Sequence, residues 1–127
     1  MSKRDDLPGF LELMKRHGVN YNANMGYVAA GWFPILDRLI PKLQAMGWDG
    51  QVAQIKEKLA RLRFYIGKGS EPLYAAITEA ETESGRTCEE CGAPGRSDSW
   101  AAKENSGWIR TLCGQHGEEQ RKRNANP

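Results

Sequence analysis

The chain has 127 residues, 39% of them hydrophobic and 27% charged, with a formal net charge of +2 at pH 7. These values are ordinary for a soluble protein of one domain, or of one small domain joined to a metal-stabilised module. No apolar run approaches the roughly 20 residues of a membrane helix, and residues 1–6 lack the apolar stretch of a secretory signal. We therefore expect a cytoplasmic protein without membrane contact. The small net charge is unusual for a protein that mainly grips a phosphate backbone.

Two helices are expected in the N-terminal third. Asp6 can cap the first, which has Pro8 in its opening turn and one apolar face formed by Leu7, Phe10, Leu11 and Met14. His17-Gly18 ends it, because glycine suits the left-handed position after a helix. A second helix is expected from about Trp32 to Met46, with Pro41 placed to kink it and an apolar stripe of Ile35, Leu36, Leu39, Ile40, Leu43 and Met46.

The segment from Gln51 to Ile66 fits two interpretations. Its apolar residues follow a helical period, at Val52, Ile55, Leu59, Leu62 and Ile66. Residues 62–66 alone alternate as a strand does. We favour a helix to about Ala60 followed by a short strand, with a β-hairpin as the competing interpretation. Ser70 then caps a helix that begins Glu71-Pro72, and its buried face is formed by Leu73, Ala76, Ile77 and Ala80.

Three cysteines and one histidine form two ligand pairs, Cys88-x-x-Cys91 and Cys113-x-x-His116. Pairs of this spacing, separated by a longer segment, are typical of a tetrahedral zinc site. These are the only cysteines, and in a reducing cytosol paired cysteines are more often metal ligands than disulfides. The sequence therefore predicts one structural Zn²⁺ held by all four residues. An iron–sulfur centre is the less common alternative for such a set.

The residues around the ligands predict how this module folds. Gly92 follows the second cysteine as in zinc knuckles, Trp100 and residues 107–112 suggest the arms of a hairpin, and His116 lies in the first turn of a final helix. Knuckle, hairpin and helix in this order are typical of a treble clef. Four protein ligands also close the zinc shell, which leaves no position for a catalytic water.

A longer series of motifs extends beyond the ligands: Gln54-Ile55-Lys56-Glu57-Lys58, Leu62-Arg63-Phe64-Tyr65, Cys88-x-x-Cys91-Gly92-x-x-Gly95 and Gly107-Trp108-x-x-Thr111-Leu112-Cys113-x-x-His116. The series resembles a group of small bacterial and phage proteins with a Q-[VI]-K-E-K-F-G-x-L-R-F-Y segment ahead of a C-x-x-C-G-x-x-G … G-W-x-x-T-L-C-x-x-H zinc module. The resemblance implies a shared fold and zinc site over about the C-terminal two-thirds of the chain, and supplies no activity. The chain has Leu59-Ala60 where the group has Phe-Gly, which favours a helix over a glycine turn.

Two charged segments are candidate partner surfaces. The basic one can hold nucleic acid by charge and stacking, or can be a solvated face whose long side chains cover apolar surface; it comprises Lys56, Lys58, Arg61, Arg63, Tyr65 and Lys68. The acidic one lacks basic residues nearby in the sequence, and comprises Glu71, Glu79, Glu81 and Glu83. Such a run is usually a solvated helix face, and alternatively it mimics phosphate toward a basic partner.

The catalytic alternatives lack residues that they need. An HNH-type nuclease requires a histidine base and further metal ligands, whereas His116 is predicted to be a zinc ligand and His17 lies at a distant helix end. A zinc deaminase requires a His-x-Glu motif ahead of Pro-Cys-x-x-Cys, which the sequence does not contain. We therefore do not expect an enzyme.

The expected fold is α+β and mostly helical, with short helices and a strand packed on a C-terminal treble-clef-like zinc module. The helical region spans residues 1–84, the zinc-binding module 85–120 and a flexible basic tail 121–127. The expected function is that of a non-catalytic zinc-binding protein that docks on a macromolecular partner. The phage resemblance makes an adaptor or inhibitor of a host protein or nucleoprotein complex the most concrete version. The alternative is a nucleic-acid-binding protein that uses residues 56–68 and the basic tail.

Overall fold

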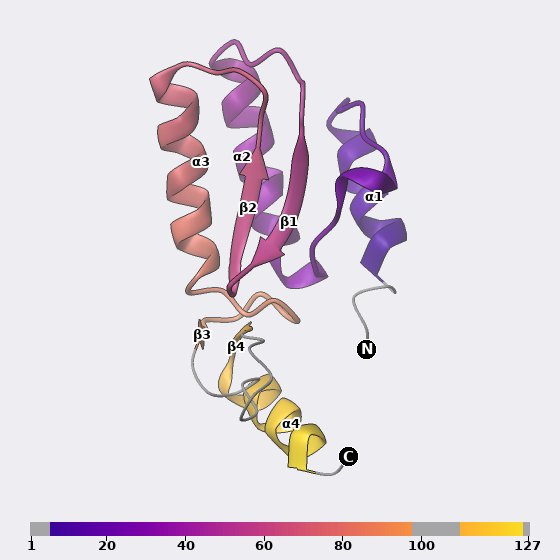
Figure 1. Ribbon diagram of the computed structural model, residues 1–127, viewed down its shortest axis with the longest axis vertical. Helices are drawn as coiled ribbons and strands as arrows, with labels where there is room; N and C mark the ends of the chain where they lie inside the picture. The colour runs from indigo at the N-terminus through magenta and orange to yellow at the C-terminus, as the bar shows by residue number, and fades with distance from the viewer. Residues whose placement is uncertain (1–5, 98–109, 126–127) are drawn as a thin grey trace.

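The computed structural model describes residues 6–97 and 110–125, with side chains up to residue 122. Within these residues the fold is α+β, with four α-helices and two small antiparallel sheets (Figure 1). In chain order the elements are α1 (Leu7–Arg16), the 3-10 turns η2 (Ala23–Met25) and η3 (Ala30–Trp32), α2 (Phe33–Ala45), β1 (Gln54–Lys58), β2 (Arg61–Tyr65), α3 (Glu71–Ser84), β3 (Arg96–Ser97), β4 (Thr111–Leu112) and α4 (Gly114–Ala125). Among the described helices, none has the length and apolar character that crossing a membrane requires.

The first helix is present where predicted, but Leu13 is buried in addition to the predicted Phe10 and Met14, Leu7 and Leu11 are only half-buried, and its start differs. α1 buries Phe10, Leu13 and Met14, and Gly18 follows it with φ +73°, the left-handed conformation that glycine adopts without strain. Asp6 precedes the helix but does not cap it, because its Oδ2 instead accepts a hydrogen bond of 3.0 Å from the Ala30 amide. This bond ties the start of α1 to the turn before α2.

The next two helices supply most of the core behind the first sheet. α2 buries the predicted stripe except Met46, which is 42% exposed beyond the helix end, and keeps Pro41 within the helix. α3 begins at Glu71 and buries the predicted Leu73, Ala76, Ile77 and Ala80, with Ser84 as a further buried residue. Ser70 occupies the N-cap position with extended backbone, but its side chain makes no capping hydrogen bond.

The segment from Gln51 to Ile66 contains a β-hairpin, so the helix that we favoured up to Ala60 is wrong and the competing interpretation is correct. β1 and β2 pair antiparallel with Lys58 opposite Arg61, which leaves a two-residue turn of Leu59 and Ala60. Both turn residues have positive φ, +54° and +68°, as a type I′ turn requires. This turn is difficult to predict from the sequence because Leu59 and Ala60 occupy positions where Asn or Gly is usual.

The hairpin lies over α2 and beside α3, and both of its edges are covered (Figure 1). Its inner face carries Ile55, Leu62 and Phe64 into the core. Along β2, the Leu62 amide donates to Ser84 Oγ at 2.9 Å, and the Phe64 amide donates to Glu81 Oε2 at 3.0 Å, so α3 side chains satisfy that edge.

The loop after α1 covers the other edge, along β1. Tyr21 Oη donates to the Gly26 carbonyl at 2.7 Å and accepts a hydrogen bond from the Ile55 amide. Gly26 has φ +98°, and an added Cβ there would lie 2.4 Å from the Ile55 carbonyl oxygen. Only a glycine therefore lets the loop lie this close to β1.

The C-terminal module sits at the turn end of the hairpin and is joined to the helical region by backbone contacts (Figure 1). Thr111 Oγ1 donates to the Ala60 carbonyl at 2.6 Å, and Trp32 Nε1 donates to the Thr87 carbonyl at 2.8 Å. A Cβ on Gly31 would lie 2.1 Å from the Cys88 carbonyl oxygen, so this contact has no room for a side chain. α4 continues to Ala125, into the segment for which the sequence predicts a frayed tail.

Candidate metal centre and basic face

Four side chains converge in the C-terminal module as the sequence predicts. The ligand atoms of Cys88, Cys91, Cys113 and His116 all lie within 4.8 Å of one another. Cys91 Sγ is 3.8 Å from Cys113 Sγ, and His116 Nδ1 is 3.6 Å from Cys88 Sγ and 3.2 Å from Cys113 Sγ. These residues are therefore positioned to bind one metal ion.

A tight turn brings the first ligand pair together. The Cys88 amide donates to the Ala93 carbonyl at 2.8 Å, and the Gly92 amide donates back to the Cys88 carbonyl at 2.9 Å. Gly92 has φ +82°, a conformation that favours glycine, as predicted for the residue after the second cysteine. The turn reverses the chain within five residues, which places both thiols on one side.

The start of α4 determines the positions of the second ligand pair. Cys113 immediately precedes the helix and His116 lies in its first turn. The His116 amide points at Cys113 Sγ at 3.5 Å, and the Gly117 amide donates to the Cys113 carbonyl at 2.8 Å. The His116 amide in the first turn of α4 therefore faces the Cys113 sulfur, an arrangement that favours a negative charge there.

The metal-free thiols differ in acidity because they differ in surroundings. Burial raises the pKa of the Cys88 thiol to about 11. Burial also acts to raise the pKa of Cys113, but hydrogen bonds from the His116 amide and from the neighbouring ligand side chains hold it at about 7. Metal binding requires deprotonated thiols, so an ion entering this cluster releases protons, most of all from Cys88.

Buried charges between the ligand pairs are a feature that sequence reasoning missed. Arg110, with a side chain 6% exposed, lies 3.6 Å from Glu89 Oε1 through its Nε and 2.9 Å from Glu90 Oε2 through its Nη2. Its Nη1 donates to Gln120 Oε1 at 3.2 Å. Arg110 thus joins the two residues inside the Cys-x-x-Cys turn to helix α4.

Glu89 also joins the turn to β4. Its Oε2 accepts a hydrogen bond from the Thr111 amide, and its own amide donates to the Thr111 carbonyl, both at 2.9 Å. β3 pairs antiparallel with β4, Arg96 with Leu112 and Ser97 with Thr111, so the end of the predicted second arm is a strand, whereas its partner strand β3 was not predicted. Trp100 and residues 107–109, also predicted for these arms, lie outside the described residues.

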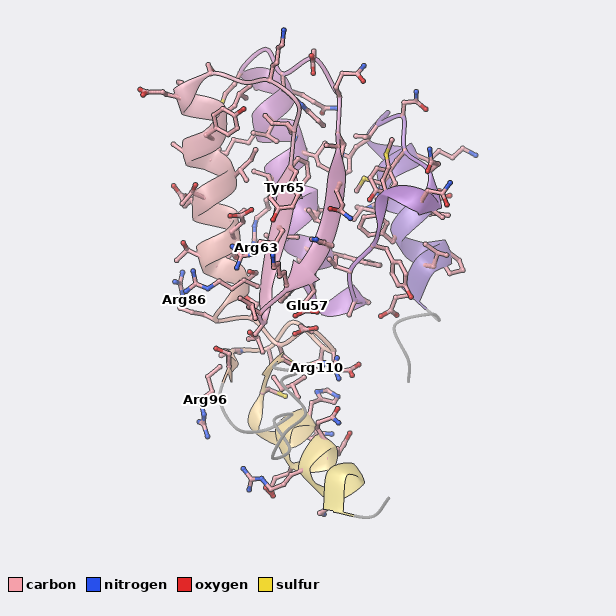
Figure 2. All side chains as sticks on the ribbon, viewed as in Figure 1. Glu57, Arg63, Tyr65, Arg86, Arg96 and Arg110 are labelled. Atoms are coloured by element: carbon pink, nitrogen blue, oxygen red, sulfur yellow. The ribbon has the colours of Figure 1, made fainter. Side chains whose placement is uncertain are left out.

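The predicted basic residues gather on one face of β1–β2, called the open face below. It consists of Gln54, Lys56, Lys58, Arg61, Arg63 and Tyr65, with Lys56 opposite Arg63 and Lys58 opposite Arg61. Figure 2 shows Arg63 and Tyr65 on the side of the sheet that is turned away from α2. Lys56 Nζ lies 5.9 Å from the centre of the Tyr65 ring, and Tyr65 is 41% exposed. Lys68 lies apart from this face, in the bend that leads to α3, near Asp49 and Met46.

The predicted acidic residues are used within the fold. Glu83 pairs with Arg38 of α2, Glu79 lies 3.7 Å from Lys42 of α2, and Glu81 accepts the Phe64 amide. These partners are distant in the sequence, which is why the glutamates looked unpaired there. The remaining member, Glu71, is exposed at the start of α3.

The other histidine joins two helices. His17 Nε2 lies 2.6 Å from Asp37 Oδ1, and Arg16 donates to the same oxygen at 2.9 Å. The hydrogen bonds from His17 and Arg16 hold the pKa of Asp37 below its usual value. This cluster fixes the end of α1 against α2.

Comparison with known proteins gives no relative from which a role could be transferred. No family model matches the chain, and neither the curated proteins nor the solved structures contain a significant match.

Proposed function

We propose that the protein is a non-catalytic, zinc-stabilised binding protein that docks on an anionic macromolecular partner through the open face. The observation that carries this proposal is the register of β1–β2, which puts four cationic side chains and an exposed tyrosine on one surface. The six positions of the open face include no carboxylate. Charges of one sign gathered on one surface select and steer a partner of the opposite sign.

The ligand geometry supports zinc as the ion. With Zn–S bonds of about 2.3 Å, two sulfurs of a tetrahedral site lie about 3.8 Å apart, and a sulfur and a nitrogen lie about 3.5 Å apart. The Cys91–Cys113 separation is 3.8 Å, and the two separations that involve His116 Nδ1 are 3.6 and 3.2 Å. Three cysteines and one histidine are a common set for structural zinc.

The order of elements around the ligands supports a treble-clef-like fold for the module and a structural role for the ion. A turn carrying Cys88 and Cys91, the pair β3–β4, and α4 with His116 in its first turn follow one another. Four protein ligands fill a tetrahedral shell, so the zinc that we propose holds the module together rather than activating a water.

Of the partners that the phage resemblance suggests, a nucleoprotein complex fits the positive sign of the open face.

Retention on immobilised polyanions, heparin and dextran sulfate, tests the docking surface. The test variant is Arg61→Glu/Arg63→Glu, and the control is Lys15→Glu/Lys42→Glu, which makes the same charge change at exposed positions of α1 and α2. We expect the wild type and the control to elute at similar salt concentrations and the open-face variant to elute much earlier. Equal elution of the two variants would contradict the proposal.

Native mass spectrometry tests the ion. We expect one zinc per chain in the wild type and none in a Cys113→Ser/His116→Ala variant. A different metal bound in its place, or a folded wild type without any metal, would contradict the zinc assignment.

A further inference from the structure

We infer, building on the proposed function, that the partner of the open face is single-stranded nucleic acid, and that its binding track continues from the hairpin over Arg86 and Arg96 onto the metal module. Figure 2 shows Arg63, Arg86 and Arg96 following one another down the molecule. The track that we infer therefore runs from the β1–β2 hairpin onto the C-terminal metal module.

The cations on the hairpin are spaced for a chain of phosphates. Lys56 and Lys58 are two residues apart on β1, as are Arg61 and Arg63 on β2, which separates successive cations by about 6.8 Å along each strand. This is on the order of the spacing between neighbouring phosphates in an extended single strand.

Close contacts connect the cations of the hairpin to those next to the metal module. Arg61 lies along the end of α3, where its Nε is 3.1 Å from the position that a Cβ on Gly85 would occupy. The next residue, Arg86, is exposed, and its carbonyl accepts a hydrogen bond of 2.8 Å from the Gly95 amide. Arg96 follows Gly95 at the start of β3 and is also exposed. A strand lying on Arg61 therefore meets Arg86 and Arg96 next.

Tyr65 distinguishes nucleic acid from an acidic protein as the partner. Its exposed ring lies among the cations, with Lys56 5.9 Å from the ring centre. Stacking of bases on aromatic rings beside a basic groove is how proteins bind single strands without sequence preference. An acidic peptide would pair with the cations and leave the aromatic ring without a comparable role.

The hairpin is not built to enter the groove of a duplex. A β-ribbon that reads the major groove has to protrude. Here Ala60 at the turn is fully buried, and its carbonyl is bonded to Thr111 of the metal module. The open face instead lies between α3 and the loop that covers β1, where an extended single strand with its bases unstacked can lie along the sheet.

The small net charge agrees with this assignment because the described carboxylates near the hairpin and in the metal module are engaged by other groups of the protein. Glu79 and Glu83 pair with cations of α2, and Glu89 and Glu90 surround Arg110. Glu57 of β1, on the opposite face from the open-face residues, accepts the Ala60 amide, and Glu81 of α3 accepts the Phe64 amide. The overall charge of +2 thus hides a concentration of cations on one surface.

Fluorescence anisotropy with a labelled oligothymidine of about 20 nucleotides tests the partner, using the zinc-loaded full chain and a duplex of the same length for comparison. We expect tighter binding of the single strand than of the duplex, with an affinity that falls steeply as salt rises, because bound phosphates release counterions. Equal or tighter duplex binding would overturn the assignment.

Three variants map the track. We expect Arg61→Glu/Arg63→Glu and Arg86→Glu/Arg96→Glu each to lose more than about tenfold in affinity and to flatten the salt dependence, while the control Lys15→Glu/Lys42→Glu loses much less. We expect Tyr65→Ala to lose about tenfold toward the oligonucleotide and to elute normally from heparin. Unchanged affinity of the Arg86/Arg96 variant would overturn the extension onto the metal module, and unchanged affinity of Tyr65→Ala would overturn the stacking role. Circular dichroism and zinc content check that each variant is folded.

The oligonucleotide anisotropy experiment and the polyanion retention experiment together separate this inference from the proposed function. A wild type that ignores the oligonucleotide but binds polyanions through Arg61 and Arg63 would overturn nucleic acid as the partner and support anionic docking. A wild type that binds neither would overturn both.

Discussion

The two small sheets of this protein are held in place by different forces. β1–β2 buries Ile55, Leu62 and Phe64 in a core shared with three helices. Around β3–β4 the buried apolar cluster within the described residues consists of Cys88 and Leu112, with Cys113 packed against it. In this described part of the module, the ligand cluster and the buried pair of Arg110 and Glu89 lie where β1–β2 has apolar side chains. Among the described residues, nonpolar packing therefore dominates around β1–β2, and potential metal ligands and buried charges dominate around β3–β4.

The largest effect is expected from removing one metal ligand, which should affect the C-terminal module and spare the region around β1–β2. Cys88→Ser should abolish metal binding and release the order of residues 86–97 and 110–120, because zinc binding in such modules supplies about 10–16 kcal/mol of folding free energy. α2 and β1–β2 should keep their protection in amide hydrogen exchange. Metal removal from the wild type by a chelator should give the same pattern. Equal loss of protection across the whole chain would show that the two regions do not differ in this way.

The next effect tests the buried charges. Arg110→Ala removes a buried cation from beside Glu89 and Glu90 and should lower the free energy of unfolding by about 3–5 kcal/mol. The exposed Arg86 is a control, since Arg86→Ala should change stability by less than about 0.5 kcal/mol. Chemical denaturation of the zinc-loaded proteins measures both. A cost for Arg110→Ala as small as that of the control would mean that the module does not depend on this ion pair.

A smaller effect is expected at the edge of the hairpin. Ser84→Ala removes the acceptor for the buried Leu62 amide and should cost about 1–3 kcal/mol. Ser70 at the other end of α3 makes no side-chain capping bond, so Ser70→Ala should cost less than about 0.5 kcal/mol. The same denaturation experiment compares the two. A larger cost for Ser70→Ala would show that capping matters more to α3 than its contact with β2.

The smallest expected effect is a gain in stability at the hairpin turn. Ala60→Gly should raise the free energy of unfolding by about 0.5–1 kcal/mol, because a left-handed conformation strains alanine more than glycine. The same substitution at Ala75, exposed within α3, should lower it by about 1 kcal/mol. Thermal unfolding of the two variants gives the signs. A destabilised Ala60→Gly would mean that the buried methyl group contributes more than the turn conformation costs.

Much of the helical region and the ligand set could be predicted, because both depend on local spacing. The apolar periods of α1, α2 and α3 and the two x-x ligand pairs each lie within a short window of sequence. The hairpin could not be predicted with equal success. Ile55 and Leu62, which face the core from two strands, are seven residues apart and imitate two helical turns. Leu59, counted in that apparent helical face, is 63% exposed in the turn.

Contacts between distant residues explain the rest of what was missed. Nothing in the local sequence pairs Glu89 with Arg110, or Glu83 with Arg38, because only the folded chain brings them together. The basic residues were identified as a set, but a helix would have distributed them around its axis. The antiparallel register collects them on one surface instead.

The covered edges of β1–β2 also determine how this protein can associate with others. An exposed strand edge invites a strand from another chain, either as a recognition mode or as the start of aggregation. Here Ser84 and Glu81 already accept the outward amides of Leu62 and Phe64 on one edge, and Tyr21 accepts that of Ile55 on the other. These contacts therefore disfavour sheet extension between copies at this hairpin. Any partner of the hairpin has to be recognised by side chains rather than by backbone pairing.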